Sequence, residues 1–180
     1  MDRKNRMIEP KTKKPTVLIL GMGDTGVLVA SRLHRHFNVI GVSTKPNLLS
    51  GQELGKRLTD LSWWQTHYNT PLTQFKALGA VTIVHGKAEC VDMTAEAVTV
   101  ERMDGNTESI GYDYLVIASG TSNGFWRTDR VQSSNEISDE LSHQAERIKS
   151  ASSITVVGGG PSGVSVALNI KRAEPEKSVT

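Results

Sequence analysis

The clearest pattern in the chain is a short apolar run, followed by a series of glycines and then by periodically spaced apolar residues. Residues 17–20 read Val-Leu-Ile-Leu, residues 21–26 read Gly-Met-Gly-Asp-Thr-Gly, and apolar residues recur over 27–33. A continuous apolar run predicts a strand buried on both faces, and the periodic segment predicts a helix. We therefore expect a buried strand, a glycine turn and a helix in succession.

The same pattern recurs near the end of the chain. Residues 154–157 read Ile-Thr-Val-Val, residues 158–163 read Gly-Gly-Gly-Pro-Ser-Gly, and an apolar-rich segment follows over 164–170. Both copies have the spacing Gly-x-Gly-x-x-Gly: Gly21, Gly23 and Gly26 in the first, and Gly158, Gly160 and Gly163 in the second. A single match can be a structural turn, but two matches between strand and helix patterns indicate parts of two dinucleotide sites.

Each glycine of such a turn has a separate physical task. The first permits the tight turn, the second lets the backbone approach a pyrophosphate, and the third lets the helix pack closely on the strand. The phosphates then lie at the N-terminus of a helix, where unpaired N–H groups and the helix dipole favour anions.

Between the two motifs, the polarity pattern predicts further strands. A second strand is expected over residues 37–42 and another over 81–84. Alternating segments around Asp104-Gly105-Asn106 predict a hairpin over 97–110, because Asp-Gly between such segments is a strong turn signal. The run over 112–121 predicts a buried strand that ends in small residues, which permit close approach of a ligand.

Two serine-to-glutamate spacings predict helix starts. Ser50 and Glu53 fit a capping box, and the helix predicted to follow carries Leu54, Leu58, Leu61 and Trp64 on one face. Ser133 and Glu136 fit a second capping box, with a helix that runs to about residue 149. Adjacent aromatic residues within 123–127 form a loop that either borders a planar cofactor or packs at a hinge.

Composition narrows the function classes. The 180 residues carry a net charge of only +2, which gives no basis for a nucleic-acid partner. The chain has neither an apolar run long enough for a transmembrane segment nor the apolar core of a secretory signal, so a cytoplasmic location is expected. The basic, proline-containing residues 1–15 predict a disordered tail.

The chain contains one cysteine, Cys90. A single thiol excludes an intrachain disulfide, a redox-active cysteine pair and a multi-cysteine metal site within this sequence. The alternating polarity around Cys90 predicts a packed thiol rather than a reactive one. His34 and His36 lie two positions apart and would point to different sides of a helix, so no metal site is expected.

The residues that follow the second predicted strand are consistent with either of two nucleotides at the first motif. A carboxylate about 20 positions after the first glycine usually bonds the ribose hydroxyls in such sites. This chain instead has Ser43, Thr44 and Lys45. The hydroxyl groups of Ser43 or Thr44 could bond a ribose, whereas Lys45 could meet a 2′-phosphate, which would place NADP in the first site.

The order of these pieces resembles the two-dinucleotide-binding flavoproteins, the pyridine-nucleotide-dependent FAD oxidoreductases. The resemblance rests on the two glycine motifs and on the segment Tyr-Asp-Tyr-Leu-Val-Ile-Ala-Ser-Gly over 112–120, and it covers residues 16–180. Without a cysteine pair, the chain looks more like the apoptosis-inducing-factor and type II NADH dehydrogenase branch than like the disulfide reductases. The implied fold class is α/β: a Rossmann-like domain with a parallel sheet and a small antiparallel meander, then the start of a second Rossmann-like domain.

The resemblance implies FAD at the first motif and NADH or NADPH at the second. It implies that the FAD pyrophosphate is held by Gly21, Gly23, Asp24, Thr25 and Gly26. It places the ribose at Ser43 or Thr44, a basic contact at Arg57, the adenine at the backbone of Ala88, and further contacts at Ser119 and Gly120. It assigns the nicotinamide-dinucleotide loop to Gly158, Gly160, Pro161, Ser162 and Gly163.

The implied activity is transfer of hydride from NAD(P)H to the flavin and of electrons onward to a small-molecule or quinone-type acceptor. Residues 16–130 would form the first part of an FAD-binding domain, and residues 131–180 the truncated start of an NAD(P)-binding domain. Members of this group need further segments, so we expect a fragment of a longer enzyme, and its assembly could be a homodimer. A single-site NADP-binding reductase and a non-catalytic nucleotide-binding or redox-sensing module are the alternatives.

Overall fold

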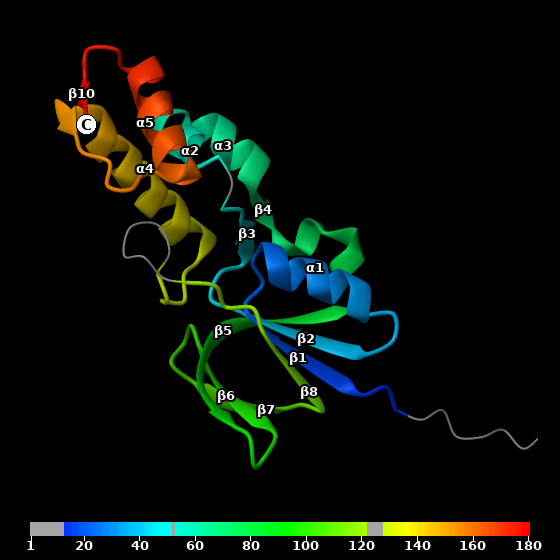
Figure 1. Ribbon diagram of the computed structural model, residues 1–180. Helices are drawn as coiled ribbons and strands as arrows, with labels where there is room; N and C mark the ends of the chain where they lie inside the picture. Colours follow the sequence, from blue (N-terminus) through cyan, green and yellow to red (C-terminus); the bar gives the residue numbers. More distant parts are fainter. Residues whose placement is uncertain (1–12, 52, 122–127) are drawn as a thin grey trace, which may run out of the picture.

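The computed structural model describes residues 13–51, 53–121 and 128–180, and its main feature is a six-stranded sheet. The strand order is β7-β6-β5-β2-β1-β8 (Figure 1). Four strands pair in parallel: β1 (Thr16–Leu20), β2 (Asn38–Ser43), β5 (Val81–Asp92) and β8 (Tyr114–Ile117). The predicted α/β fold class is therefore confirmed.

Strand β5 changes partners along its length. Its first half pairs with β2, and its second half pairs antiparallel with β6 (Ala97–Arg102), with an irregularity between Ala88 and Cys90. Strand β7 (Thr107–Gly111) completes this hairpin, which curls away from the parallel strands in Figure 1. The hairpin predicted around the Asp-Gly turn is confirmed.

Strand β1 is the centre of the core, with Val17 to Leu20 at most 7% exposed. Val17 and Ile19 pack in one cluster with Ala30 of α1 (Asp24–Leu33), and Leu18 and Leu20 pack in another with Val98 and Val100 of β6. The helix therefore covers one face of β1 and the hairpin covers the other. A strand buried on both faces is what the continuous apolar run predicts.

An excursion of short elements leads from β2 to β5. It contains the antiparallel pair β3 (Asn47–Leu49) and β4 (Asn69–Pro71), the helices α2 (Leu54–Thr59) and α3 (Leu61–Tyr68), and the 3-10 turns η1 (Leu72–Gln74) and η2 (Lys76–Leu78).

The capping box predicted at Ser50 is wrong. Helix α2 begins after Glu53, which has a φ of 52°, and the Ser50 hydroxyl lies 3.4 Å from Oδ2 of Asp24. The predicted single helix is also divided at Asp60, whose carboxylate accepts a hydrogen bond from the Trp63 N–H and caps α3. Because Ser50 is held by a residue distant in sequence, local spacing could not show this.

The last part of the chain begins with α4 (Ser134–Ser150). The predicted capping box is confirmed there, since Ser133 and Glu136 exchange side-chain and backbone hydrogen bonds. Helix α5 (Pro161–Ala173) follows, and β9 (Ser153–Ile154) and β10 (Ser178–Val179) pair in parallel. Figure 1 shows α2, α3, α4 and α5 gathered at the opposite end of the molecule from the hairpin.

Three burial predictions are corrected. The strand expected over 112–121 shortens to β8, an edge strand in the described sheet, with Tyr114 57% and Ile117 69% exposed. The strand expected over 154–157 shortens to β9, and Val157 is 93% exposed. Cys90 is exposed rather than packed, because the outer half of β5 leaves the parallel core to pair with the hairpin.

The predicted disordered tail falls on residues 1–15, of which 1–12 lie outside the described residues, as does the aromatic loop 123–127. Within the described part of the chain, no helix is both long and apolar enough to cross a membrane. The same residues bring together no group of three or more metal-ligating side chains.

Candidate functional site

The first glycine turn lies between the end of β2 and the residues that follow β8. Gly21 has a φ of 98°, and its N–H donates to the carbonyl of Val42 at 2.8 Å. A Cβ at this position would lie 2.5 Å from the carbonyl oxygen of Ala118, which follows β8. Both the positive φ and the missing space require glycine.

The other two glycines differ in the space around them. A Cβ on Gly26 would lie 1.9 Å from the carbonyl oxygen of Gly21, so its absence lets α1 pack onto the turn. A Cβ on Gly23 would meet none of the described atoms within 4 Å. Gly23 is also the N-cap of α1, and no described side chain caps it. The turn therefore has one open side, at a helix N-terminus suited to an anion.

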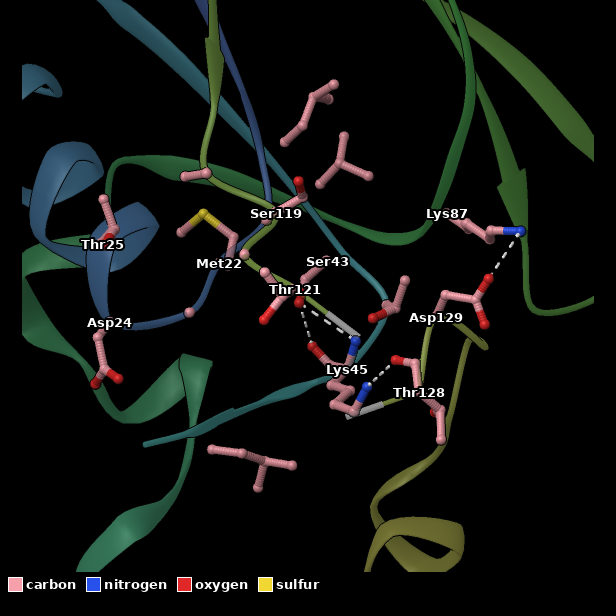
Figure 2. Close-up of a pocket in the computed structure, with 18 of the residues that line it drawn as sticks. Met22, Asp24, Thr25, Ser43, Lys45, Lys87, Ser119, Thr121, Thr128 and Asp129 are labelled. Carbon is pink, nitrogen blue, oxygen red and sulfur yellow. Dashed lines mark hydrogen bonds and ion pairs between the residues drawn. The ribbon is translucent and has the colours of Figure 1, made fainter. Parts of the chain in front are cut away.

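A pocket of about 480 Å³ opens on this side (Figure 2). Its size lies within the range typical of small-molecule and cofactor sites. Nearly all residues predicted for the first site line it: Gly21, Gly23, Asp24, Thr25, Ser43, Thr44, Arg57, Ala88, Ser119 and Gly120. The exception is Gly26, which packs behind the turn. The residues present fit a phosphorylated nucleotide, with space at Gly23 for close approach of phosphate to the backbone.

Polar groups at the end of β2 and just after it form hydrogen bonds within the protein. The Ser43 hydroxyl donates to the carbonyl of Lys45 at 2.7 Å and accepts from the Lys45 N–H at 3.3 Å. The Lys45 ammonium donates to the carbonyl of Thr128 at 3.0 Å. Burial lowers the pKa of Lys45 below its ordinary value, an effect that the charge of Glu140 opposes. Ser43 thus shapes a local turn, and Lys45 brings a cation to the pocket wall.

A segment far along the chain closes this side of the pocket. Nε2 of His85 lies 3.3 Å from the carbonyl oxygen of Thr44 and 3.1 Å from that of Gln132. Both oxygens are acceptors, so Nε2 carries a hydrogen. The Gln132 N–H also donates to Thr44 O at 2.9 Å, and the Gln132 amide donates to Glu140 at 2.6 Å.

Lys87 and Asp129 form an ion pair at 3.8 Å beside the pocket, where both residues line it (Figure 2). Lys87 also pairs with Glu89 at 2.9 Å. Sequence reasoning missed Thr128 and Asp129, because no local motif marks a segment that reaches the pocket from a distant part of the chain. It also missed Lys87, which no motif marks although it precedes the predicted Ala88 on β5.

Arg57 reaches the pocket from α2. Only 4% of Arg57 is exposed, and its guanidinium carbon lies 4.5 Å from the centre of the fully buried Trp64 ring. Stacking on an aromatic face favours a guanidinium group by cation–π attraction and holds it in one orientation. The predicted basic contact is therefore placed at the pocket wall by α2 and α3 together.

Asp24 is turned toward the segment before α2. Its Oδ2 lies 3.3 Å from the Gly51 nitrogen and 3.4 Å from the Ser50 hydroxyl, both of which can donate to it. Asp24 is the first residue of α1, where a carboxylate is favoured by the helix dipole. Its carboxylate thus contacts the Ser50–Gly51 segment at the edge of the pocket.

The second glycine turn has the same backbone form. Gly158 has a φ of 111°, and a Cβ on Gly163 would lie 1.9 Å from the carbonyl oxygen of Gly158. Gly160 is the N-cap of α5, with Pro161 at the start of the helix and Ser162 next. Among the described atoms, nothing lies within 4 Å of a Cβ on Gly158 or Gly160. The second turn is formed but lies outside the pocket of the first.

Comparison with known proteins shows which family this chain resembles. A family model for the pyridine nucleotide-disulphide oxidoreductases matches residues 15–180. Ferroptosis suppressor protein 1 of Xenopus laevis is 30% identical over 96 residues, which are 53% of this chain and 25% of that protein. Apoptosis-inducing factor homolog A of Dictyostelium discoideum is 29% identical over 168 residues, 92% of this chain and 39% of that protein. The chain thus spans well under half the length of these curated relatives.

The fold is shared with solved structures as well. NDH2 of Plasmodium falciparum, solved in complex with NADH, has a TM-score of 0.69 and 19% sequence identity over 93% of this chain and 41% of that one. At this identity the likeness shows the fold alone, whereas the family model covers nearly the whole sequence. The chain belongs to the pyridine nucleotide-disulphide oxidoreductase family.

Proposed function

We propose that this chain is the nucleotide-binding part of an FAD-dependent oxidoreductase, with FAD in the first pocket and NADH or NADPH at the second glycine turn. The observation that carries the proposal is the open side of the first turn. Gly21 and Gly26 are enclosed by backbone, whereas Gly23 faces a pocket of about 480 Å³ at the N-terminus of α1. A turn built only for packing has no need of this opening.

The residues of the pocket suggest separate roles. The backbone from Gly21 to Thr25 would hold the pyrophosphate, since N-terminal N–H groups of a helix bind anions. Arg57, stacked on Trp64, would bring a positive charge to the cofactor. Ser119 and Gly120 line the wall that follows β8, where small residues leave room for a ligand.

When bound, the flavin supplies the redox chemistry by accepting hydride from the nicotinamide and passing electrons to an acceptor. The protein's part is to bind both nucleotides, orient them and shape the site. We propose a small-molecule or quinone-type acceptor, on the likeness to the type II NADH dehydrogenase branch. The cytoplasmic location and the homodimer stay predictions from the sequence.

We propose residues 16–130 as the first part of the FAD-binding domain and residues 131–180 as the start of the NAD(P)-binding domain. The repeated turn, with α1 after the first copy and α5 after the second, supports this division. The relatives' greater length supports the proposal that the chain is part of a longer enzyme.

The competing assignment, NADP in the first pocket, has one observation in its favour. Lys45 lines the pocket with a half-buried ammonium, which could meet a 2′-phosphate. That ammonium already donates to the carbonyl of Thr128, and the assignment leaves the second glycine turn without a role.

An absorption spectrum of the longer enzyme proposed above, purified at full length and recorded before and after anaerobic addition of NADH, tests the proposal. We expect flavin bands that bleach when NADH is added. A colourless protein that takes up NADPH but not FAD would instead favour a single-site NADP-binding reductase. Bound flavin that NADH and NADPH leave oxidised would favour a non-catalytic module.

A further inference from the structure

Helix α2 lies between the two nucleotide turns and contacts structures that belong to each. Arg57 on α2 lines the first pocket, and Leu58 packs in a cluster with Val166 and Ile170 of α5. Helix α5 begins at the second glycine turn. A helix of six residues therefore connects the wall of one site to the helix that carries the other.

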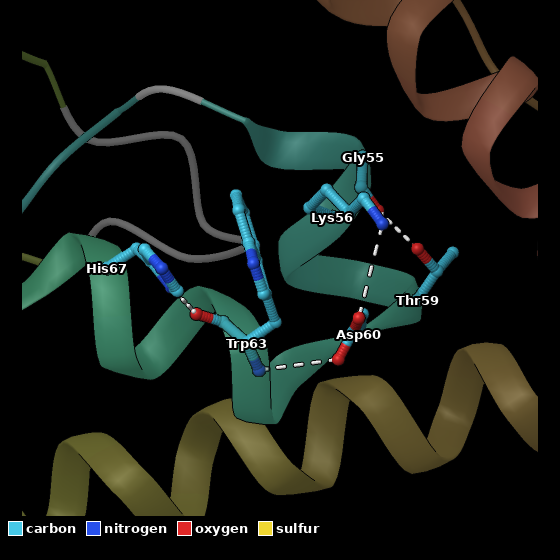
Figure 3. Close-up of polar contacts among 6 residues, drawn as sticks. All are labelled: Gly55, Lys56, Thr59, Asp60, Trp63 and His67. Carbon is cyan, nitrogen blue, oxygen red and sulfur yellow. Dashed lines mark hydrogen bonds and ion pairs between the residues drawn. The ribbon is translucent and has the colours of Figure 1, made fainter.

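At Gly55, α2 approaches α5 closely. Gly55 is buried, and a Cβ there would lie 2.7 Å from the carbonyl oxygen of Ser165 and 2.5 Å from Nδ2 of Asn169. The first of these atoms is backbone of α5, and it also accepts a hydrogen bond from the Asn169 amide at 2.9 Å. A side chain at position 55 could be accommodated only if the two helices moved apart. Figure 3 shows Gly55 on the side of α2 nearest to α5.

The position of Gly55 is tied to that of Arg57 by helix geometry. Residues two apart on an α-helix are separated by about 200°, so Gly55 and Arg57 lie on nearly opposite sides of α2. Leu58, three residues after Gly55, lies on the same side as Gly55 and makes the apolar contact with α5. One side of α2 therefore contacts α5, which begins at the second glycine turn, and the other side lines the first pocket.

We propose that Gly55 is a positioning residue that fixes the second nucleotide turn relative to the first pocket. Its contact with Ser165 and Asn169 holds α5 against α2, and α2 holds Arg57 in the pocket. A ligand that contacts Arg57 then restrains α5 and its N-terminal turn through the same short helix. This coupling by the ligand rests on the proposed function, whereas the contact of α2 with α5 does not.

Hydrogen exchange of backbone amides tests the contact without any ligand. In Gly55→Ala, we expect the backbone amides of residues 158–173 to exchange about tenfold faster or more, because the new Cβ disrupts the packing of α5 on α2. The amides of β1 and β2 should keep their exchange rates. Gly79→Ala is the matched control, since a Cβ there would meet only the carbonyl oxygen of Lys76, at an ordinary 3.4 Å. Unchanged exchange in 158–173, or equal acceleration throughout the main sheet, would overturn the proposal.

A second measurement adds FAD and tests the coupling. Saturating FAD should slow exchange within 158–173 by about fivefold or more in the unaltered chain and in Gly79→Ala, and less than about twofold in Gly55→Ala. FAD affinity should stay within about threefold in all three proteins. Equal slowing with and without the Gly55 substitution, or no slowing in the unaltered chain with FAD bound, would overturn the coupling. Failure of the unaltered chain to bind FAD would count against the proposed function and leave the ligand-free result to decide the role of Gly55.

Discussion

The two glycine turns have the same backbone form but different surroundings. The first glycines, Gly21 and Gly158, have φ angles of 98° and 111°, and in each turn a Cβ on the third glycine would lie 1.9 Å from the carbonyl oxygen of the first. Strand β1 before the first turn lies between β2 and β8, whereas in the described structure β9 pairs only with β10. Within the described residues, the strand before the first turn therefore has a neighbouring strand on both sides, and the strand before the second turn has one.

This difference separates what glycine spacing determines from what packing determines. The spacing sets the shape of each turn, since both copies have it. The neighbouring strands determine how tightly each turn is packed. A Cβ on Gly21 would clash with the backbone of Ala118, whereas a Cβ on Gly158 would meet none of the described atoms within 4 Å. Equivalent substitutions in the two turns should therefore have unequal effects on the stability of the main sheet.

The largest difference is expected for Gly26→Ala against Gly163→Ala. Both introduce the same clash, 1.9 Å from a carbonyl oxygen. In the first turn, the clash lies within the core around β1 and α1, so we expect a loss of about 4 kcal/mol in the free energy of unfolding. In the second, the clash lies beside a two-stranded sheet and a smaller apolar cluster, so a loss of about 1 kcal/mol is expected. Urea unfolding followed by circular dichroism measures both, and equal losses would show that the surroundings have no influence.

A smaller difference is expected for Gly21→Ala against Gly158→Ala. A positive φ costs an L-residue roughly 1–2 kcal/mol, and both positions carry this cost. At Gly21, the new Cβ would also lie 2.5 Å from the Ala118 oxygen, so a total of about 3 kcal/mol is expected. The same unfolding assay compares the variants, and a Gly158→Ala variant as unstable as Gly21→Ala would contradict the account.

The smallest effect concerns Lys45, a cation of the first pocket. Its folded-state pKa is lowered by burial, so between that pKa and the ordinary value of 10.5 the unfolded chain binds more protons than the folded one. The stability of the unaltered protein relative to Lys45→Met should therefore rise as the pH is increased toward 10.5. Unfolding of the two proteins across this alkaline range measures the difference. A difference that is constant with pH, or that falls, would argue against the buried ammonium.

Much of this arrangement could be predicted from local sequence. The two glycine spacings predict both turns, and Ser133 with Glu136 predicts the start of α4. Such features depend on residues within a few positions of one another, where chain geometry alone brings the groups together.

The errors concern contacts that are distant in sequence. Ser50 has the right spacing for a cap, but its hydroxyl lies next to Asp24. Tyr114 and Ile117 belong to an apolar run, yet β8 lies at the edge of the described sheet. An apolar run does not determine how many strands flank the strand that it forms. The exposure of Tyr114 and Ile117 therefore could not be predicted from the sequence.

The pocket shows the same limit. Glycines and small residues of the first turn could be selected by motif, whereas Thr128 and Asp129 reach the pocket through contacts with residues distant in sequence. Lys45 donates to the carbonyl of Thr128, and Lys87 pairs with Asp129. The Ser43 hydroxyl, which with Thr44 is predicted to lie at a ribose, also hydrogen-bonds with the backbone of Lys45, a contact that no motif showed. The ribose contact of Ser43 or Thr44 stays a prediction.

The most direct test of the central claim is flavin occupancy in Gly23→Val, measured by absorption together with thermal unfolding. A Cβ at Gly23 meets no described protein atom within 4 Å, so the added side chain should enter the space proposed for the pyrophosphate and destabilise the fold only by the roughly 1 kcal/mol expected for valine at a helix N-cap. The account predicts a protein that is folded as before and has lost its flavin. Full flavin occupancy in a stable Gly23→Val protein would contradict it.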